Sequence, residues 1–322
     1  MDLLAASVPA AFGDDRSKAA HASGRFALEL ATDRAQFEEG FALLDLQFGP
    51  LGEMEREEVL SAWFERGSLS PPDAPIQARY HMVLARDEHG TIAGVRDMFV
   101  TTDRAANLSV ALLSHSLVLP PFRRTGLASL LRAVPVPLAQ AVLPGAEIML
   151  CAEMEMVRPD DRDSIVRLMA YRRAGFQVIP PAVLGYAQPD FGEWRDDARP
   201  IPLLAIVRRI GSESDTTIPR GRAWAYVAHY HAAQSCHCDP RQIAAIRANA
   251  EQAFAVHPDD PIPLLPLPSH PDERELVRPL LRSVAFRAYP KAWQGAEPLG
   301  DPDADLHALA LAWSGERIRD KG

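Results

Sequence analysis

One stretch of the sequence, residues 114–133 (SHSLVLPPFRRTGLASLLRA), constrains the fold more than any other. Its β-forming residues end at a Pro-Pro pair, a basic turn with one glycine follows, and an apolar helical pattern then begins. A strand that passes through a tight turn into a helix leaves backbone N–H groups unbonded at the turn, where the helix dipole also favours negative charge. The stretch therefore predicts a strand, an anion-binding loop and a helix, in that order.

The residues of this turn suit a phosphate ligand. Arg123 and Arg124 supply charged donors, and Gly126 lets the backbone approach a ligand closely because it has no Cβ. Ala128 is small for the same reason. We therefore expect the turn residues to bind an anion: Arg123, Arg124, Thr125, Gly126, Leu127 and Ala128.

The residues Val118, Pro120, Arg123, Gly126 and Ala128 have the spacing V-x-P-x-x-R-x-x-G-x-A. This resembles the acetyl-CoA signature of the GNAT superfamily of N-acetyltransferases, in which the loop amides hold the CoA pyrophosphate and the preceding strand pairs with the pantetheine arm. The resemblance implies that Leu117, Val118 and Leu119 belong to the cofactor-binding residues. The resemblance implies acetyl-CoA as co-substrate, no metal, and acyl transfer to an amino group of a small molecule or peptide by direct attack. An ordinary strand–turn–helix with a surface arginine pair is the alternative.

The order of expected elements also matches the GNAT pattern, over roughly residues 25–210. It implies an α/β (α+β) fold in which helices flank a mixed, mostly antiparallel central sheet. Strands are expected at 25–32, 80–86, 91–102, 108–119, 147–152, 176–179 and 203–208, and helices after Asp33 and at 54–66, 126–134 and 160–173. Phe37, Phe41, Leu44 and Leu46 are expected to form one apolar helix face.

The pattern divides the chain into a flexible leader at 1–24, the GNAT domain at 25–210, a linker at 211–220 and a mainly helical C-terminal extension at 221–322 of unknown role. Helices in the extension are expected at 224–233, 240–254, 272–286 and 303–314. Pro135 and Pro137 fall inside what would be one helix in the family, so a short first helix and a kinked or restarted second piece are predicted.

Three residues are candidates for the catalytic steps. Tyr171 lies four residues before Gly175, where family members carry a tyrosine that protonates the CoA thiolate; a core tyrosine is the alternative. Glu153 and Glu155 follow the strand at 147–152 and point to the same face because strand side chains alternate, so either could act as general base. For carbonyl polarisation, the resemblance implies a backbone N–H near Leu117 or Val118.

Several other residues have alternative roles. His115 on the strand before the loop could act as the base, and Asp97 is a weaker candidate. Asp160 and Asp161 would cap a helix, and Arg172 and Arg173 lie in solvent or reach the 3′-phosphate of CoA. The His/Cys residues His229, His231, Cys236, His237 and Cys238 lack C-x-x-C spacing, so no metal is expected.

Bulk composition narrows the partners. The net charge of −9 argues against a nucleic-acid binder, and no apolar run is long enough to span a bilayer, so no membrane association is expected. Three cysteines cannot form a complete disulfide framework, so we expect a cytoplasmic protein. Members of the GNAT superfamily often dimerise, so the resemblance allows a homodimer. Two other functions stay open: a non-catalytic GNAT-fold module that binds CoA or acyl-CoA, and a zinc-binding interaction protein centred on residues 221–322.

Overall fold

The computed structural model describes residues 14–51, 54–154, 162–189, 201–235 and 238–270. Their contacts group the chain into two compact units. Unit 1 comprises Met1–Ala152 with Arg209–Gly211, and unit 2 comprises Glu153–Arg208 with Ser212–Gly322. The expected helices at 272–286 and 303–314, together with Glu155, Asp160, Asp161, Cys236 and His237, lie outside the described residues.

Unit 1 is built on a mixed sheet. Strands β1 (Ala27–Leu30), β2 (Ile76–Arg86), β3 (Ile92–Asp103) and β4 (Leu108–Val118) are antiparallel neighbours in chain order, and β5 (Glu147–Met154) adds to β4 in parallel. This confirms the predicted mixed, mostly antiparallel sheet. Its helices are α2 (Asp15–Ala22), α3 (Arg34–Phe48), α4 (Glu57–Arg66), α5 (Leu127–Ala133) and α6 (Pro135–Val142), with short 3₁₀ turns η1 (Gly49–Leu51) and η2 (Pro120–Phe122).

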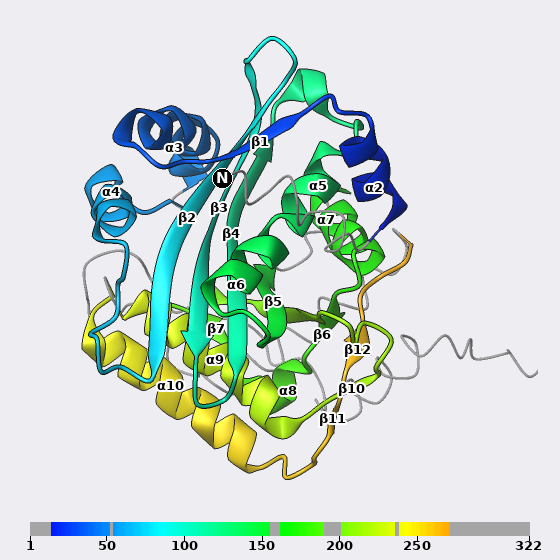
Figure 1. Ribbon diagram of the computed structural model, residues 1–322. Coiled ribbons are helices and arrows are strands. Elements are labelled where there is room, and N and C mark those ends of the chain that lie inside the picture. The colour runs from blue at the N-terminus through cyan, green and yellow to red at the C-terminus, as the bar shows by residue number, and fades with distance from the viewer. Residues whose placement is uncertain (1–13, 52–53, 155–161, 190–200, 236–237, 271–322) are drawn as a thin grey trace, which may run out of the picture. The chain divides into compact units, whose positions relative to one another are not determined.

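Opposite faces of this sheet pack on different helices (Figure 1). A Cβ added to Gly40 of α3 would stand 2.4 Å from Met82 Sδ, so β2 meets α3 at close range on one face. On the other face, a Cβ on Gly94 of β3 would lie 3.2 Å from Leu131 of α5. Since strand side chains alternate, neighbouring residues of β3 point to different helices.

Helix α3 begins as the sequence predicts. The carboxylate of Asp33 accepts the N–H of Gln36 at 2.9 Å, which satisfies one of the unbonded donors of the first turn. Phe37, Phe41 and Leu44 are buried, but Leu46 is 77% exposed, so its assignment to the same face was wrong. Nine residues separate Leu46 from Phe37, which is half a turn out of phase at 100° per residue.

Residues 15–22, which we expected in a flexible leader, form helix α2, capped by Asp14 through the N–H of Ser17 at 2.7 Å. Helix α2 packs against α5 (Figure 1). The start of the chain therefore adds a helix to unit 1.

The break between α5 and α6 lies where the prolines predict it. Pro135 and Pro137 have no N–H, so the carbonyls of Leu131 and Ala133 lose their i+4 donors. Arg96 of β3 is fully buried on the α5 side, and its Nη1 donates to Leu131 O at 3.4 Å. A guanidinium group thus takes the place of the missing backbone donor.

Unit 2 contains α7 (Arg162–Arg173), α8 (Pro181–Leu184), α9 (Arg220–Gln234) and α10 (Pro240–Ala255). Its strands are β6 (Gln177–Val178), β7 (Ala187–Gln188), β8 (Ile201–Pro202), β9 (Leu204–Arg209), β10 (Thr217–Ile218), β11 (Ile262–Pro263) and β12 (Leu265–Pro266). Strands β9, β6 and β12 are adjacent, and two further pairs join β7 to β8 and β10 to β11. Helices α9 and α10 confirm the helices expected at 224–233 and 240–254, and β10 lies within the expected linker.

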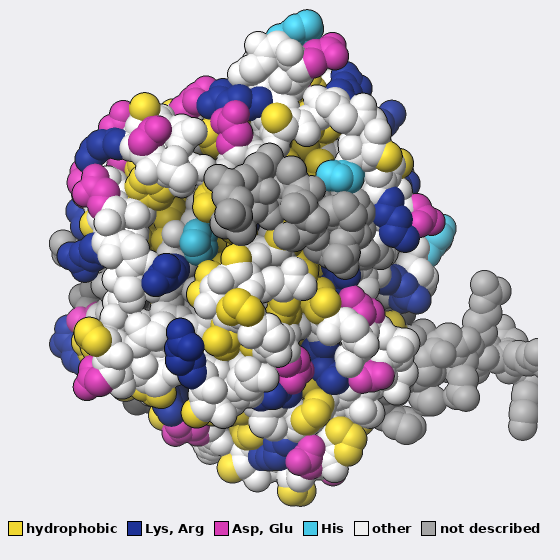
Figure 2. Space-filling model, viewed as in Figure 1, with side chains coloured by type: hydrophobic (Ala, Val, Ile, Leu, Met, Phe, Trp, Pro, Cys, Tyr) yellow, Lys and Arg dark blue, Asp and Glu magenta, His cyan; other side chains and the backbone are white. Residues whose placement is uncertain are grey.

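On the face drawn in Figure 2, acidic and basic side chains are interspersed. In the described part of the chain, no helix combines the length and apolar character needed to cross a membrane.

The coupling between Arg96 and the helix break is testable by a double-mutant cycle. Pro135→Ala supplies the N–H that Leu131 O lacks, so Arg96→Met should cost about 1 kcal/mol less in the Pro135→Ala protein than in wild type, measured by urea unfolding. Pro137→Ala is the matched control, because Ala133 O has no bond from Arg96, and its coupling should stay below about 0.5 kcal/mol. Equal coupling to both prolines would contradict this account.

Candidate active site

The loop after β4 joins a strand to a helix, as the sequence predicts. Arg124 and Gly126 are both left-handed, with φ of 66° and 88°, and the Thr125 hydroxyl donates to Phe122 O. In the described part of the chain, the N–H groups of Arg124, Thr125, Gly126 and Ala128 make no hydrogen bond. Consecutive unbonded N–H groups in such turns form a concave site that suits an anion.

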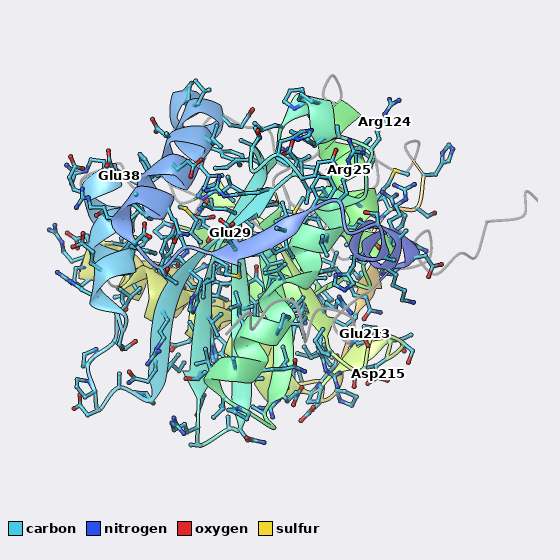
Figure 3. All side chains as sticks on the ribbon, turned by 45° about the horizontal axis from the view of Figure 1, so that its top comes forward. Arg25, Glu29, Glu38, Arg124, Glu213 and Asp215 are labelled. Atoms are coloured by element: carbon cyan, nitrogen blue, oxygen red, sulfur yellow. The ribbon has the colours of Figure 1, made fainter. Side chains whose placement is uncertain are left out.

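Three arginines add positive charge near this loop. Arg123 is exposed and its Nε donates to Val118 O at 3.4 Å, while the exposed Arg124 and Arg25 lie at the same end of unit 1 (Figure 3). Arg25 lies over the ring of Phe26, which in turn meets Phe122 edge-on at 6.1 Å. Sequence analysis missed Arg25, because only packing across the fold brings it near residues 120–128.

The structure gives Gly126 a different role from the one we predicted. A Cβ at this position would lie 2.8 Å from the carbonyl oxygen of Arg16 and 2.9 Å from Ala20 Cβ. Helix α2 therefore occupies the Cβ side of Gly126, where we had expected a ligand to approach. The glycine is required by its positive φ and by the close approach of α2.

Strand β4 leaves β5 just before the loop. The parallel pairing of the two strands ends at Leu113 and Ala152, whereas β4 stays paired with β3 as far as Val118. Leu119 donates its N–H to Ala93 O at 3.0 Å. Because alternate N–H groups along a strand face the same neighbour, Leu117 N–H faces β3 and Val118 N–H faces the edge where β5 no longer pairs. Of the two residues predicted to polarise a carbonyl, the geometry favours Val118.

A cluster of polar residues lies at the bulge of β4. Residues 114 and 115 both fall opposite Asp97, because the β3–β4 register moves from Arg96 with Ser116 to Met98 with Leu113. The buried Asp97 accepts the His115 N–H at 2.6 Å and the Tyr80 hydroxyl at 3.0 Å, and lies 3.2 Å from His115 Nδ1. Burial raises the pKa of Asp97, but the charge and hydrogen bonds of His115 outweigh it and keep the pKa below its usual value.

The carboxyl of Glu55, which precedes α4, interacts electrostatically with His115 and Asp97 of this cluster. Burial raises the pKa of this half-buried carboxyl to about 7, opposed by the charge of His115, while Asp97 raises it further. Glu55 and Tyr80 gave no functional signal in the sequence, since they come from separate elements that only the folded sheet brings to Asp97.

The predicted catalytic residues Tyr171 and Glu153 lie in unit 2. Gly175 ends α7 at φ 85°, Phe176 N–H donates to Tyr171 O at 3.1 Å, and Gly175 N–H donates to Arg172 O at 2.9 Å. These two bonds form a Schellman motif, and its hydrophobic contact is the edge-on pair of Tyr171 and Phe176 at 4.9 Å. Glu153 accepts a hydrogen bond from the buried Tyr186 hydroxyl.

Arg172 donates to Leu267 O, and both Arg172 and Arg173 are exposed, which is the solvent position that we considered. Among the described residues, no group of His, Cys, Asp and Glu could hold a metal ion. His231 is buried, and burial lowers its pKa to about 4, so its ring is neutral at physiological pH.

Comparison with known proteins gives likenesses in structure only. No family model matches the sequence, and neither does any curated protein. Solved structures that resemble it include a spermidine N-acetyltransferase from Vibrio cholerae in complex with CoA and spermine, at 10% identity and a TM-score of 0.37, with 60% of this chain and 99% of that chain covered. A GNAT-family acetyltransferase from Staphylococcus aureus Mu50 has 15% identity and a TM-score of 0.34, with 57% and 99% covered.

A third likeness is to a fungal multi-domain GH3 beta-N-acetylglucosaminidase with a glucosamine N-acetyltransferase region. Its identity is 19% and its TM-score 0.34, and the match covers 48% of this chain but only 17% of that chain. The similar structures thus include GNAT N-acetyltransferases, the superfamily that the loop sequence resembles. At such TM-scores they carry no argument about the site, which rests on the chain's own sheet and loop.

Substitution of Gly126 should weaken the packing of α2 and lower the free energy of unfolding. Gly126→Ala and Gly90→Ala both place a Cβ at positive φ, 88° and 78°, but only Gly126 has neighbouring atoms within 4 Å. Both should lose about 1 kcal/mol of unfolding free energy through backbone strain, and Gly126→Ala at least a further ~1 kcal/mol through the clash. Urea unfolding measures the free energies, and amide hydrogen exchange of residues 15–22 should rise only in Gly126→Ala.

The raised pKa of Glu55 predicts a pH-dependent stability. The folded protein holds this proton up to about pH 7, whereas the unfolded chain releases it near its model value of 4.5. Between these values the folded state binds more protons, so the unfolding free energy should fall as the pH rises from 5 to 8, by up to about 2 kcal/mol through this group. Glu55→Gln should remove that part of the pH dependence, and Glu58→Gln, at an exposed position of α4, should retain it.

Proposed function

We propose that this chain is an acetyl-CoA-dependent N-acetyltransferase that transfers the acetyl group to an amino group of a small molecule or peptide by direct attack. The observation that carries the proposal is the course of β4, which leaves β5 at Leu113 and runs into the loop of left-handed residues at Arg124 and Gly126. An open strand edge followed by unbonded N–H groups suits a ligand with a peptide-like arm and a pyrophosphate.

In this proposal the loop amides and Arg123 and Arg124 bind the pyrophosphate of CoA, and the edge at 117–119 pairs with its pantetheine arm. The N–H of Val118 polarises the thioester carbonyl, where negative charge develops during attack. The strand edge and the loop both belong to unit 1, and they come from one continuous segment of the chain.

Direct attack agrees with the state of Cys151, which pairs with Leu112 of β4. Cys151 lies in β5 and is fully buried. Burial raises the pKa of its thiol well above the usual value, so it stays protonated at neutral pH and is a poor nucleophile. We propose Tyr171 as the acid for the departing thiolate; Glu153 and Glu155 are the candidate bases that the sequence analysis named.

The proposal is tested first by ligand-induced thermal stabilisation. Acetyl-CoA and CoA should raise the melting temperature of the wild-type protein, while ATP and NAD should not, because a ligand that binds only the folded state stabilises it by mass action. The double variant Arg123→Ala, Arg124→Ala should lose most of this shift. Arg66→Ala, at the exposed end of α4, is the matched control and should keep it.

The same protein is then assayed for release of the CoA thiol with ethanolamine, 1,4-diaminobutane, spermidine, glucosamine and a lysine-containing peptide. Turnover with at least one amine and a lower kcat in Tyr171→Phe support acyl transfer. Stabilisation by acetyl-CoA without turnover of any amine would instead support a CoA-binding module without catalysis, and absence of both would overturn the proposal.

A further inference from the structure

The bulge of β4 places a histidine at the point where β4 leaves β5. Ser114 and His115 follow Leu113, the last residue of β4 that pairs with β5. A β-bulge re-aims the side chain that it carries and is common next to active sites. Here the re-aimed side chain is His115, one of the weaker base candidates of the sequence analysis.

Asp97 holds this histidine at two points. Its carboxylate accepts the backbone N–H of His115 at 2.6 Å and lies 3.2 Å from the ring Nδ1, while the Tyr80 hydroxyl donates to it at 3.0 Å. Backbone and ring of the same residue are therefore fixed by one buried carboxylate. Asp97 is 1% exposed, so the contact is shielded from water.

This arrangement decides which ring nitrogen can act. A carboxylate accepts only, so Nδ1 carries the proton in the neutral ring and the basic lone pair is on Nε2. Phe48 of α3 packs against the imidazole at 5.0 Å between ring centres. The side chain of His115 keeps 15% of its surface exposed, so the ring is held but still reachable from solvent.

The charges around the ring favour a cation. Asp97 keeps its charge because its pKa is lowered, Glu55 becomes charged above its pKa of about 7, and Tyr80 is neutral because burial raises the pKa of its phenol well above the usual value. Arg96, the next residue of β3, points to the α5 side, away from this cluster. An ammonium group would therefore meet a negative potential here.

We propose that His115, positioned by Asp97, is the general base that deprotonates the acceptor amine, and that Glu55 attracts this amine as its ammonium ion. The inference rests on the proposed function and replaces Glu153 and Glu155 in the role of base. It makes the acceptor a primary amine that is cationic in solution.

The reaction then balances as follows. The ammonium gives one proton to Nε2 of His115, and its nitrogen attacks the thioester carbonyl carbon. A C–N bond forms, the C–S bond breaks, and the second proton of that nitrogen ends on the departing sulfur. The products are the amide and the CoA thiol, and His115 returns its proton to solvent.

Asp97 is a positioning residue rather than the base. It accepts several hydrogen bonds, and its pKa is held below the usual value, so it has little tendency to take a proton. A base whose second nitrogen is fixed by a buried carboxylate is the arrangement that keeps an imidazole in one tautomer and stabilises its protonated form.

The test compares kcat and KM of the full chain with acetyl-CoA and the five amines above, across pH 5.5–9. His115→Gln should lower kcat about 10²- to 10⁴-fold, the range for loss of a general base, and abolish the fall of kcat on the acidic side at saturating amine. Its thermal stabilisation by acetyl-CoA should equal that of wild type. Asp97→Asn should lower kcat without changing the KM for acetyl-CoA, and Glu55→Gln should raise the KM for the amine at pH 8.

His89→Gln is the matched control, because this histidine lies in the β2–β3 turn with 78% of its side chain exposed, and its kinetics should be those of wild type. Tyr80→Phe removes the hydroxyl that donates to Asp97. It serves as a milder second variant if Asp97→Asn does not fold, and it should lower kcat less than Asp97→Asn. Wild-type kcat and an unchanged acidic limb in His115→Gln, with acetyl-CoA still bound, would overturn the assignment and leave the proposed function intact. Absence of both acetyl-CoA binding and turnover in wild type would overturn both.

Discussion

The end of the β4–β5 hydrogen-bond ladder is the constraint on which the candidate site of unit 1 depends. Pairing in parallel stops at Leu113 and Ala152, while the antiparallel ladder to β3 continues to Val118. Every second backbone donor of β4 beyond Leu113 thus faces an edge that β5 has left. Because an unpaired strand edge binds extended ligands through backbone hydrogen bonds, one change of partner creates the surface that leads to the loop.

Two further features support this edge from opposite faces. On one face of the sheet, α5 and α6 pack on β3 and β4. There the buried Arg96 donates to the carbonyl of Leu131, which Pro135 leaves without a backbone donor. On the other face, the bulge aligns His115 with Asp97. Arg96 and Asp97, which are neighbours in β3, therefore lie on opposite faces of the sheet, because successive strand side chains alternate.

Local sequence signals predicted the elements well where the physical cause is local. The Asp33 cap, the hairpin of β2 and β3, the kink at Pro135 and the Schellman end at Gly175 each depend on residues a few positions apart. Leu46 was assigned wrongly because a helix face depends on the angle around the axis, which residue type alone does not give. Helix α2 was missed because its stability comes from packing against α5 rather than from a strong pattern of its own.

The sequence by itself determined the loop: its prolines, arginines and glycine lie within seven consecutive residues, and the left-handed turn at Gly126 is one that glycine adopts without steric cost. Only the tertiary structure decided what surrounds that loop and strand. The contact of α2 with Gly126 and the hydrogen bonds of Tyr80 and His115 to Asp97 join residues that are 17 or more positions apart. Such contacts depend on strand register and on a one-residue bulge, which shifts side chains between the two faces and leaves no pattern in the sequence that could be recognised beforehand.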